Sequence, residues 1–331
     1  MRETRWRRAA LGLLTGVILF AAPSAHAQSP PPKYRLGFLS PASAATMAAR
    51  VDAMIAGLRD LGYAEGRDFT LEFRWADGKD ERLPALAAEL AALKVDIVLA
   101  HGVGAARAAH AARSETPVVC APCGDMGATG LVASLSRPGG SVTGLTIIAP
   151  ETTGKRLELL KSIMPGVTRH GVMWNTANPV SGREMKETEA AARVLGMQVQ
   201  SVGVTDPGTL DRAFATMRAA RTEALIVLSD AKLYGRRKEI ADLAIAAQLP
   251  TVSFNRGFAQ AGGLIGYGPD LIATARRIAI YVDKIVKGAK PAELPIEQPT
   301  KFELVVNLKT ARSIGLTIPR AVVVRADEVI E

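Results

Sequence analysis

The feature that most limits the fold of this chain is a repeated unit: an apolar strand, a loop of small residues and an amphipathic helix. About four such units precede residues 137–160, and about four or five follow them. This alternation predicts parallel strands joined by right-handed helical crossovers. Because 331 residues are enough for two hydrophobic cores, the sequence predicts two α/β lobes of similar construction.

Residues 137–160 mark the first passage between the predicted lobes. A strand punctuated by glycine and proline, at 142–148, runs there into a new helix. A second Gly-flanked strand at 262–268 is predicted to return the chain, and residues 291–299 to cross a third time. The expected organisation is a leader at 28–33, a first lobe at 34–147 plus about 267–292, and a second lobe at 148–266 plus about 300–331.

Residues 1–27 have the composition of a secretory signal peptide. Four arginines precede an apolar run at 9–22, and an Ala-x-Ala sequence ends at Ala27. The alternative is a retained membrane anchor, for which the apolar run is short. Because Gln28 and not cysteine would begin the mature chain, no lipid anchor is expected. The sequence therefore predicts a soluble periplasmic protein.

The charge pattern argues against nucleic acid as a partner. The chain has 41 Lys and Arg against 32 Asp and Glu, a formal net charge of +9. The two signs are mixed along the predicted helices, which is typical of a solvated surface and not of a nucleic-acid footprint. We therefore expect no nucleic-acid partner, and a monomer.

The carboxyl ends of parallel strands are where ligand sites form, because loops there meet helix N-termini with free N–H groups. Small and polar residues occupy these positions in the sequence. The alternative for each is a local role as a helix cap or, for Trp174, a place in the core. The candidate ligand-binding residues are Ser40, Ser43, His101, Gly102, Gly104, Gly124 and Asp125 in the first lobe, and Trp174, Asn175, Asn178, Ser229, Asp230 and Asn255 in the second.

Motifs for catalysis or cofactor binding are incomplete in this sequence. The stretch that starts at His101 begins like a dinucleotide fingerprint but has Arg107 in place of the third glycine. Residues 149–155 lack the first glycine and the hydroxyl residue of a phosphate-binding loop, and no G-x-S-x-G sequence occurs. We therefore expect that the protein is not an enzyme and has no cofactor.

The only two cysteines, Cys120 and Cys123, form a C-x-x-C sequence. An oxidising compartment allows a local disulfide or a redox pair, and two unpaired thiols at a strand end are the other interpretation. The motif does not stand at the start of a helix in a small domain, as it does in thioredoxins. With no histidine nearby, two sulfurs make a poor zinc site, so no bound metal is expected.

Several separate blocks of the sequence resemble one known family. They include Leu-Gly-Tyr-Ala-Glu-Gly at 61–66, Arg-Trp-Ala-Asp-Gly at 74–78 and Lys-Arg-Leu-Glu-Leu-Leu-Lys at 155–161. The longest is Gly-Leu-Val-Ala-Ser-Leu-Ser-Arg-Pro-Gly-Gly-Ser-Val-Thr-Gly at 130–144, and the tail from 281 onward agrees. Over nearly its whole mature length, the chain resembles the tryptophan-binding-protein-like family of ABC transporter substrate-binding proteins.

The resemblance implies the type I periplasmic-binding-protein fold, with two Rossmann-like lobes joined by a hinge of three crossovers. It also implies a small-molecule ligand, such as an amino acid, and an inner-membrane ABC permease that receives it. A ligand-sensing module of the same fold and, less favoured, a periplasmic enzyme are the alternatives. The chain departs from the family at 125–127, where it has Asp-Met-Gly and similar proteins read Asp-Pro-Val, and in the C-x-x-C just before.

For an amino-acid ligand, the sequence suggests how each charged group would be held. N–H groups of the loops at 40–43 or 102–104 would bind the carboxylate, and Asp125 or Asp230 would bind the ammonium. Closure of the hinge would bury the ligand between the lobes. Because closure requires contacts that form only in the closed state, residues of the second lobe such as Asn178 are expected to affect affinity more than stability.

Overall fold

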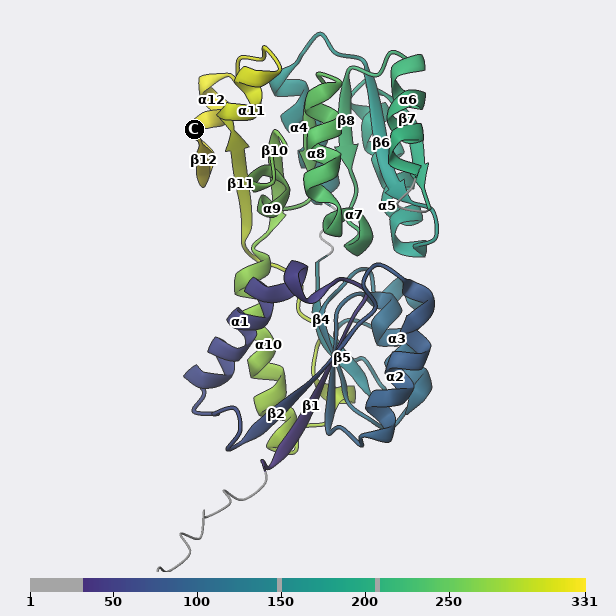
Figure 1. Cartoon of the computed structure of the whole chain (residues 1–331), viewed down its shortest axis with the longest axis vertical. Helices are drawn as coiled ribbons and strands as arrows, with labels where there is room; N and C mark the ends of the chain where they lie inside the picture. The colour runs from purple at the N-terminus through teal and green to yellow at the C-terminus, as the bar shows by residue number, and fades with distance from the viewer. Residues whose placement is uncertain (1–31, 148–150, 206–208) are drawn as a thin grey trace, which may run out of the picture. The chain divides into compact units, whose positions relative to one another are not determined.

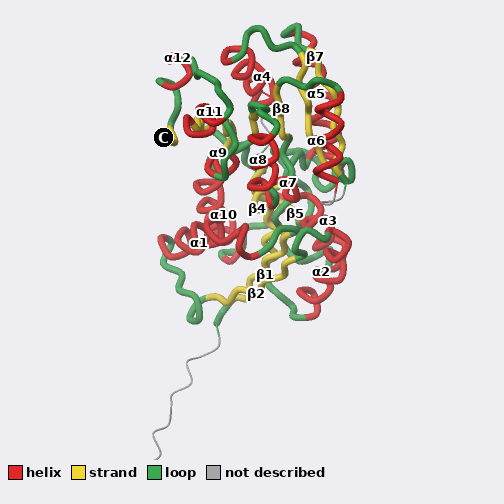
Figure 2. Tube along the Cα trace, turned by 45° about the horizontal axis from the view of Figure 1, so that its top comes forward, coloured by secondary structure: helices red, strands yellow, loops and turns green. Residues whose placement is uncertain are grey.

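The computed structural model describes residues 32–331 except 148–150 and 206–208. The described chain forms two sheets of mostly parallel strands with helices packed against them (Figure 1 and Figure 2). The predicted fold, two α/β lobes with parallel sheets, is confirmed. The predicted signal peptide lies outside the described residues, and none of the described helices is both long and apolar enough to cross a bilayer.

The first sheet has five strands in the order β2-β1-β3-β4-β5, and all of its pairs are parallel. β3 and β4 are buried along their whole length, as their apolar sequences predict. β2 lies at the edge of the sheet and is partly exposed after its first residue. The strands are β1 Tyr34–Ser40, β2 Phe69–Trp75, β3 Ile97–Ala100, β4 Val118–Cys123 and β5 Val142–Thr146.

Helices cover both faces of the first sheet. α2 and α3 pack on one face, and α1 packs on the other beside α10, which comes from far along the chain. The two helices cross closely because Gly57 has no side chain; an added Cβ would lie 2.3 Å from the carbonyl oxygen of Arg276. The helices are α1 Ala44–Asp60, α2 Leu83–Ala92, α3 Val103–Ala112 and α10 Leu271–Val286, with 3-10 turns η1 Asp80–Arg82, η2 Gly127–Thr129 and η4 Pro291–Glu293.

The second sheet has seven strands in the order β12-β11-β10-β9-β8-β6-β7. Its pairs are parallel except β10 with β11, which is antiparallel. The antiparallel pair forms because the chain leaves this sheet after β10 and re-enters it from the other lobe. The strands are β6 Arg169–Asn175, β7 Gln198–Val204, β8 Ala224–Val227, β9 Thr251–Ser253, β10 Ile265–Pro269, β11 Phe302–Asn307 and β12 Glu328–Ile330.

Helices also cover the second sheet on both faces. α4, α5, α11 and α12 share one hydrophobic core, and α6 and α8 share the other. The basic segment after β8 forms two helices, α7 and α8, that meet at Arg236. The helices are α4 Glu151–Ile163, α5 Pro179–Val194, α6 Leu210–Ala219, α7 Ala231–Gly235, α8 Arg237–Ala246, α9 Arg256–Gln260, α11 Leu308–Ser313 and α12 Arg320–Val323.

The chain passes between the two sheets three times. The first passage, between β5 and α4, includes residues 148–150, which lie outside the described residues. The second follows β10, so residues 265–269 still belong to the second sheet. The third follows Glu297, which pairs with Leu145 before the chain enters β11. On this basis we propose the lobe boundaries given above, with the second passage placed just after Pro269.

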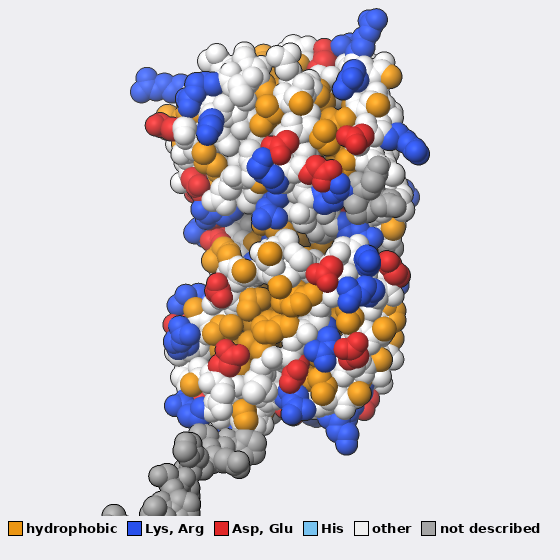
Figure 3. Space-filling view, in the orientation of Figure 1, with side chains coloured by type: hydrophobic (Ala, Val, Ile, Leu, Met, Phe, Trp, Pro, Cys, Tyr) orange, Lys and Arg blue, Asp and Glu red, His pale blue; other side chains and the backbone are white. Residues whose placement is uncertain are grey.

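The surface carries charges of both signs. On the face shown in Figure 3, Lys and Arg side chains are interspersed with Asp and Glu. Some oppositely charged side chains form ion pairs within one helix, such as Lys155 with Glu158 at 2.7 Å. This arrangement agrees with the mixed charge pattern of the sequence, and it gives this face no extended area of one sign.

Gly144 is required where β5 approaches β4. Its φ is +123°, a conformation that L side chains rarely adopt. In the register of the sheet it lies opposite Cys120, and an added Cβ would be 2.5 Å from the Cys120 nitrogen and 2.7 Å from its carbonyl oxygen. Backbone atoms cannot move away as a flexible side chain can, so only glycine fits here.

We therefore expect Gly144→Ala to lower the free energy of unfolding by about 3 kcal/mol, through backbone strain and a displaced strand. Gly140→Ala is the matched control, because an added Cβ there has no heavy atom within 4 Å. Urea denaturation followed by circular dichroism measures both. Equal stability of the two variants would contradict the assignment of a close approach at Gly144.

Candidate ligand-binding site

A cavity of about 660 Å³ lies between the carboxyl ends of strands from the two sheets. Its first-lobe wall comes from the loops after β1, β3 and β4 and from α1, α2 and α3. Its second-lobe wall comes from α4, α5 and the loops after β6, β8 and β9. The cavity is therefore at the place where parallel sheets form ligand sites.

The structure brings about half of the predicted residues to this cavity. His101, Gly102, Gly104 and Gly124 line it from the first lobe, and Asn178, Ser229 and Asp230 from the second. Ser40 and Asn175 are buried directly behind the lining residues that they contact. The others, Ser43, Asp125, Trp174 and Asn255, do not line the cavity.

The predicted residues outside the lining have local contacts. Ser43 caps α1, and its Oγ accepts a hydrogen bond from Thr46 N at 3.4 Å. Asn255 caps α9 in the same way. The Trp174 ring packs against the second-lobe core. These contacts are the helix-cap and core alternatives that the sequence left open.

Asp125 follows β4 and forms an ion pair with Arg183 of α5, with 2.7 Å between Oδ2 and Nη1. Asp125 thus contacts the second lobe directly. A second pair of this kind joins Lys232 of α7 to Asp80, at 3.1 Å. Both pairs link elements of the two lobes beside the cavity.

A hydrogen-bonded chain of three side chains forms part of the first-lobe wall. The Arg50 guanidinium on α1 lies 3.2 Å from His101 Nε2, and His101 Nδ1 lies 3.1 Å from Ser40 Oγ. Because Arg50 can only donate, Nε2 accepts and Nδ1–H donates to Ser40. Burial, followed by the nearby Arg50 cation, lowers the pKa of His101 to about 3. His101 is therefore neutral at physiological pH.

Asp230 organises the second-lobe wall. Its Oδ1 accepts hydrogen bonds from the backbone N–H groups of Lys232 and Leu233, and so caps α7. Its Oδ2 accepts from the side-chain amides of Asn175 at 3.0 Å and Asn178 at 2.9 Å. The four acceptor positions of the carboxylate are thus occupied, and the loops after β6 and β8 are tied together.

A buried ion pair lies deeper in the second lobe. Arg156 of α4 donates to Glu184 of α5 at 2.9 Å, and their side chains are 5% and 8% exposed. Glu184 also accepts hydrogen bonds from the backbone N and the hydroxyl of Ser229. Thr152 Oγ1 accepts from Arg156 Nη2. The pair joins two helices to the end of β8.

Several charged helix residues of the site were not predicted from the sequence, among them Arg50, Arg156 and Glu184. Each lies inside a helix and not at a strand end. A signal was present for Arg50, since it falls between Met47 and Met54 on the buried stripe of α1. A charged residue on an apolar stripe needs a polar partner or a cavity.

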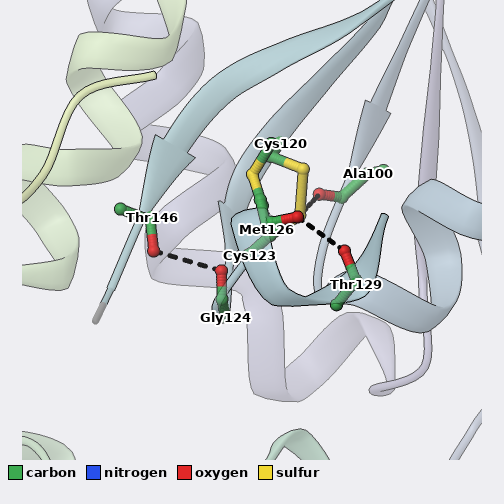
Figure 4. Close-up of a disulfide and its surroundings, with 7 residues drawn as sticks. All are labelled: Ala100, Cys120, Cys123, Gly124, Met126, Thr129 and Thr146. Carbon is green, nitrogen blue, oxygen red and sulfur yellow. Dashed lines mark hydrogen bonds between the residues drawn. A yellow bond between two sulfur atoms is a disulfide. The ribbon is translucent and has the colours of Figure 1, made fainter. Parts of the chain in front are cut away.

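The structure joins Cys120 and Cys123 in a disulfide at the end of β4 (Figure 4), with 5.3 Å between the Cα atoms. Both residues are fully buried. The register between β4 and β5 shifts between the two cysteines. Thr146 of β5 donates to the carbonyl oxygen of Gly124 at 3.1 Å, directly after the disulfide. The cross-link therefore shapes the loop that brings Gly124 to the cavity.

No group of three potential metal ligands occurs among the residues that the structure describes. Two carboxylates of the cavity, Glu184 and Asp230, instead contact a cation and N–H groups.

Two α/β lobes joined by three passages of the chain, with a cavity at their facing strand ends, define the type I periplasmic-binding-protein fold. A model of the family described as ABC transporter substrate binding protein matches residues 36–330. The chain therefore belongs to this family of binding proteins.

Relatives of known structure or name agree with this assignment. The chain is 22% identical to the tyrosine-binding protein of Clostridioides difficile (strain R20291) over 262 residues. This alignment covers 79% of this chain and 75% of the relative. A structure from Streptococcus pneumonia in complex with L-Trp aligns with a TM-score of 0.84 and 24% identity, over 90% of this chain and 100% of that one. A conserved domain protein of Vibrio cholerae aligns with a TM-score of 0.85 and 23% identity, over 90% of this chain and 99% of that one.

The neutral state of His101 predicts how stability depends on pH. An unfolded histidine takes up a proton near pH 6.5, whereas the folded pKa of His101 is about 3. Between these values the unfolded state binds more protons, so stability falls as the pH decreases. Between pH 6.5 and 4.5 we expect His101 to account for a loss of roughly 2 kcal/mol. Urea denaturation at each pH should show this extra loss in the wild type and not in His101→Gln; parallel curves would rule it out.

The disulfide predicts a second measurable effect. Replacing both cysteines, as Cys120→Ala with Cys123→Ala, should lower the free energy of unfolding by roughly 2 kcal/mol, because the short cross-linked loop gains freedom when unfolded. Chemical denaturation measures the loss, and dithiothreitol should reduce wild-type stability in the same way. Thiol titration of the unfolded wild type without reductant should find no free thiol; two reactive thiols would contradict the cross-link.

Proposed function

We propose that the protein binds an amino acid in the cavity between its lobes. The observation that carries this proposal is the charge of the cavity lining, in which cations and carboxylates occur in equal numbers. A zwitterion carries both charges and is matched by such a lining. The tyrosine-binding relative and the L-Trp complex support the same ligand class. The charged lining residues are Arg50, Arg107, Arg156 and Lys232, with Asp80, Glu184, Glu187 and Asp230.

Apolar residues of the cavity suit the side chain of such a ligand. Leu83 and Val103 contribute from the first lobe, and Val180 and Phe254 from the second. Removing an apolar side chain from water into such a pocket stabilises the complex by about 25 cal/mol per Å². The lining favours an amino acid with an apolar or aromatic side chain over a small polar one.

The ammonium group of the ligand requires a carboxylate with a free acceptor. Asp230 already accepts four hydrogen bonds, and Asp125 is paired with Arg183. Glu187 lines the cavity and forms no hydrogen bond or ion pair within the described part of the chain. Burial, and then the nearby Glu184, raise the pKa of its carboxyl. A ligand ammonium would offset both effects, so Glu187 is the proposed partner.

Ion pairs between the lobes would stabilise the closed state of the hinge around the ligand. The pairs Asp125–Arg183 and Asp80–Lys232 lie beside the cavity. A ligand that touches both walls favours the closed state by its differential affinity. Asp230, Asn175 and Asn178 then act by holding the second-lobe wall in the shape that the ligand meets.

We further propose that the protein works in the periplasm and delivers the amino acid to an inner-membrane ABC permease. The family assignment and the signal-like sequence at 1–27 support this role. A ligand-sensing module would use the same closure but pass its signal to a receptor. Genes for a permease and an ATPase adjacent to the gene of this protein, and loss of uptake on its deletion, would distinguish transport from sensing.

Thermal shift of the protein purified from the periplasm tests the ligand class. An amino acid at 100 times its Kd should stabilise the folded state by about 2.7 kcal/mol and raise the Tm by a few degrees. Glu187→Gln should weaken binding of that amino acid roughly 10- to 100-fold, as measured by calorimetry, because a half-buried ammonium loses its counter-charge. Glu189→Gln, on the same helix but outside the cavity, is the control. A panel of amino acids without any shift, or chemical conversion of the bound one, would end the proposal.

A further inference from the structure

Arg50 is a buried cation that faces the cavity without a counter-ion. The residue is 7% exposed and lines the cavity from α1. Its guanidinium contacts His101 Nε2 at 3.2 Å, the sulfur of Met47 at 4.0 Å, and the ring of Tyr234, whose centroid is 4.6 Å from the guanidinium carbon. None of these groups carries a negative charge at neutral pH.

The surroundings add positive charge to that of Arg50. Arg237 stacks on the Tyr234 ring as well, with 4.4 Å between its guanidinium carbon and the centroid. Burial is the main cause that lowers the pKa of Arg50; the interaction with Tyr234 opposes it, and Arg237 adds to the lowering. No ion pair among the described residues includes Arg50, whereas Arg156 and Lys232 each have a carboxylate partner. An isolated buried charge is costly unless it is paired.

The neighbours of Arg50 hold the guanidinium in one orientation. His101 accepts a hydrogen bond from it and is itself fixed by donation to Ser40, whose Oγ also accepts from Ala42 N. The guanidinium carbon lies over the Tyr234 ring. Nη1 makes both the hydrogen bond to His101 and the contact with the Met47 sulfur, so the edge with Nε and Nη2 is the one that a planar acceptor group would meet.

We propose that Arg50 is the anion receptor of this cavity and binds the carboxylate of the ligand. The inference rests on the proposed function, since it takes the cavity to be the ligand site. Arg156 and Lys232 are already paired with carboxylates, and Arg107 is exposed. Among the described residues of the lining, Arg50 is therefore the one buried cation without a carboxylate partner. Its single positive charge is matched better by a carboxylate than by a phosphate, which carries more negative charge. Carboxylate and guanidinium geometries also allow two parallel hydrogen bonds.

This receptor couples recognition to the second lobe. Arg50 belongs to α1 of the first lobe, and Tyr234 belongs to α7 of the second. A carboxylate bound at the edge of the guanidinium would lie beside the Tyr234 ring. Carboxylate binding would therefore favour the arrangement in which Tyr234 covers Arg50, and a ligand without an anionic group would lose that contribution.

Two matched pairs of probes test the inference: L-tryptophan with L-tryptophanamide, and indole-3-acetate with indole-3-acetamide. In the wild type, calorimetry should show each acid binding at least about 30-fold more tightly than its amide. In Arg50→Met this preference should fall below about 3-fold. Arg50→Lys should retain part of it, because lysine keeps the charge but not the planar fork. Arg59→Met, at an exposed residue of the same helix, should bind like the wild type.

The Tm of the ligand-free protein separates a receptor from a structural residue. Arg50→Met should match or exceed the wild-type Tm, because it removes an unpaired buried charge. A lower Tm together with an unchanged acid-to-amide ratio would overturn the inference. Amino-acid binding with an Arg50-independent ratio would leave the proposed function standing and refute the receptor. Arg50-dependent binding of indole-3-acetate, together with an amino-acid panel that gives no thermal shift, would support the receptor and refute the proposed function. Binding of none of the four probes would refute the receptor.

Discussion

The placement of charge at the facing strand ends is the constraint on which the cavity depends. A side chain that is ionised and buried there needs a partner of opposite charge or hydrogen bonds, from the protein or from a ligand. Asp230 accepts hydrogen bonds from four N–H groups, and Arg156 forms an ion pair with Glu184. These two groups therefore hold the second-lobe wall in place. Arg50 has only neutral partners, His101 and Tyr234, and so remains the group with charge to offer.

The same constraint explains why the fold was easier to predict than the site. Parallel strands and amphipathic helices follow from hydrophobic spacing, and the carboxyl ends of the strands follow from strand order. His101 and Asp230 could be found because they come directly after a strand. Arg50 and Glu184 lie in helix interiors, where spacing shows only which face is buried. Whether that face meets a core or a cavity depends on packing between elements far apart in the sequence.

The C-terminal third of the chain illustrates another limit of local pattern. α10 packs beside α1 of the first lobe, although the strands on either side of it, β10 and β11, pair with each other in the second. Helical periodicity alone predicts the helix; its place in the first lobe is predicted from the Gly-flanked strand at 262–268, which returns the chain. The contact is decided by shape, since Gly57 lets the backbone of α1 approach that of α10. A glycine within a helix is a weak signal until the partner helix is known.

The loop after β4 is where the chain departs most from the family pattern, and it lies against the second lobe. In place of a proline that would limit the backbone, this chain has the Cys120–Cys123 cross-link just before the loop. The cross-link, with Gly144 opposite, fixes the end of β4. An added Cβ at Gly124 would lie 2.8 Å from Val180 of α5, so the two walls meet closely there. The cross-link and this close approach together fix the part of the first-lobe wall that Gly124 forms.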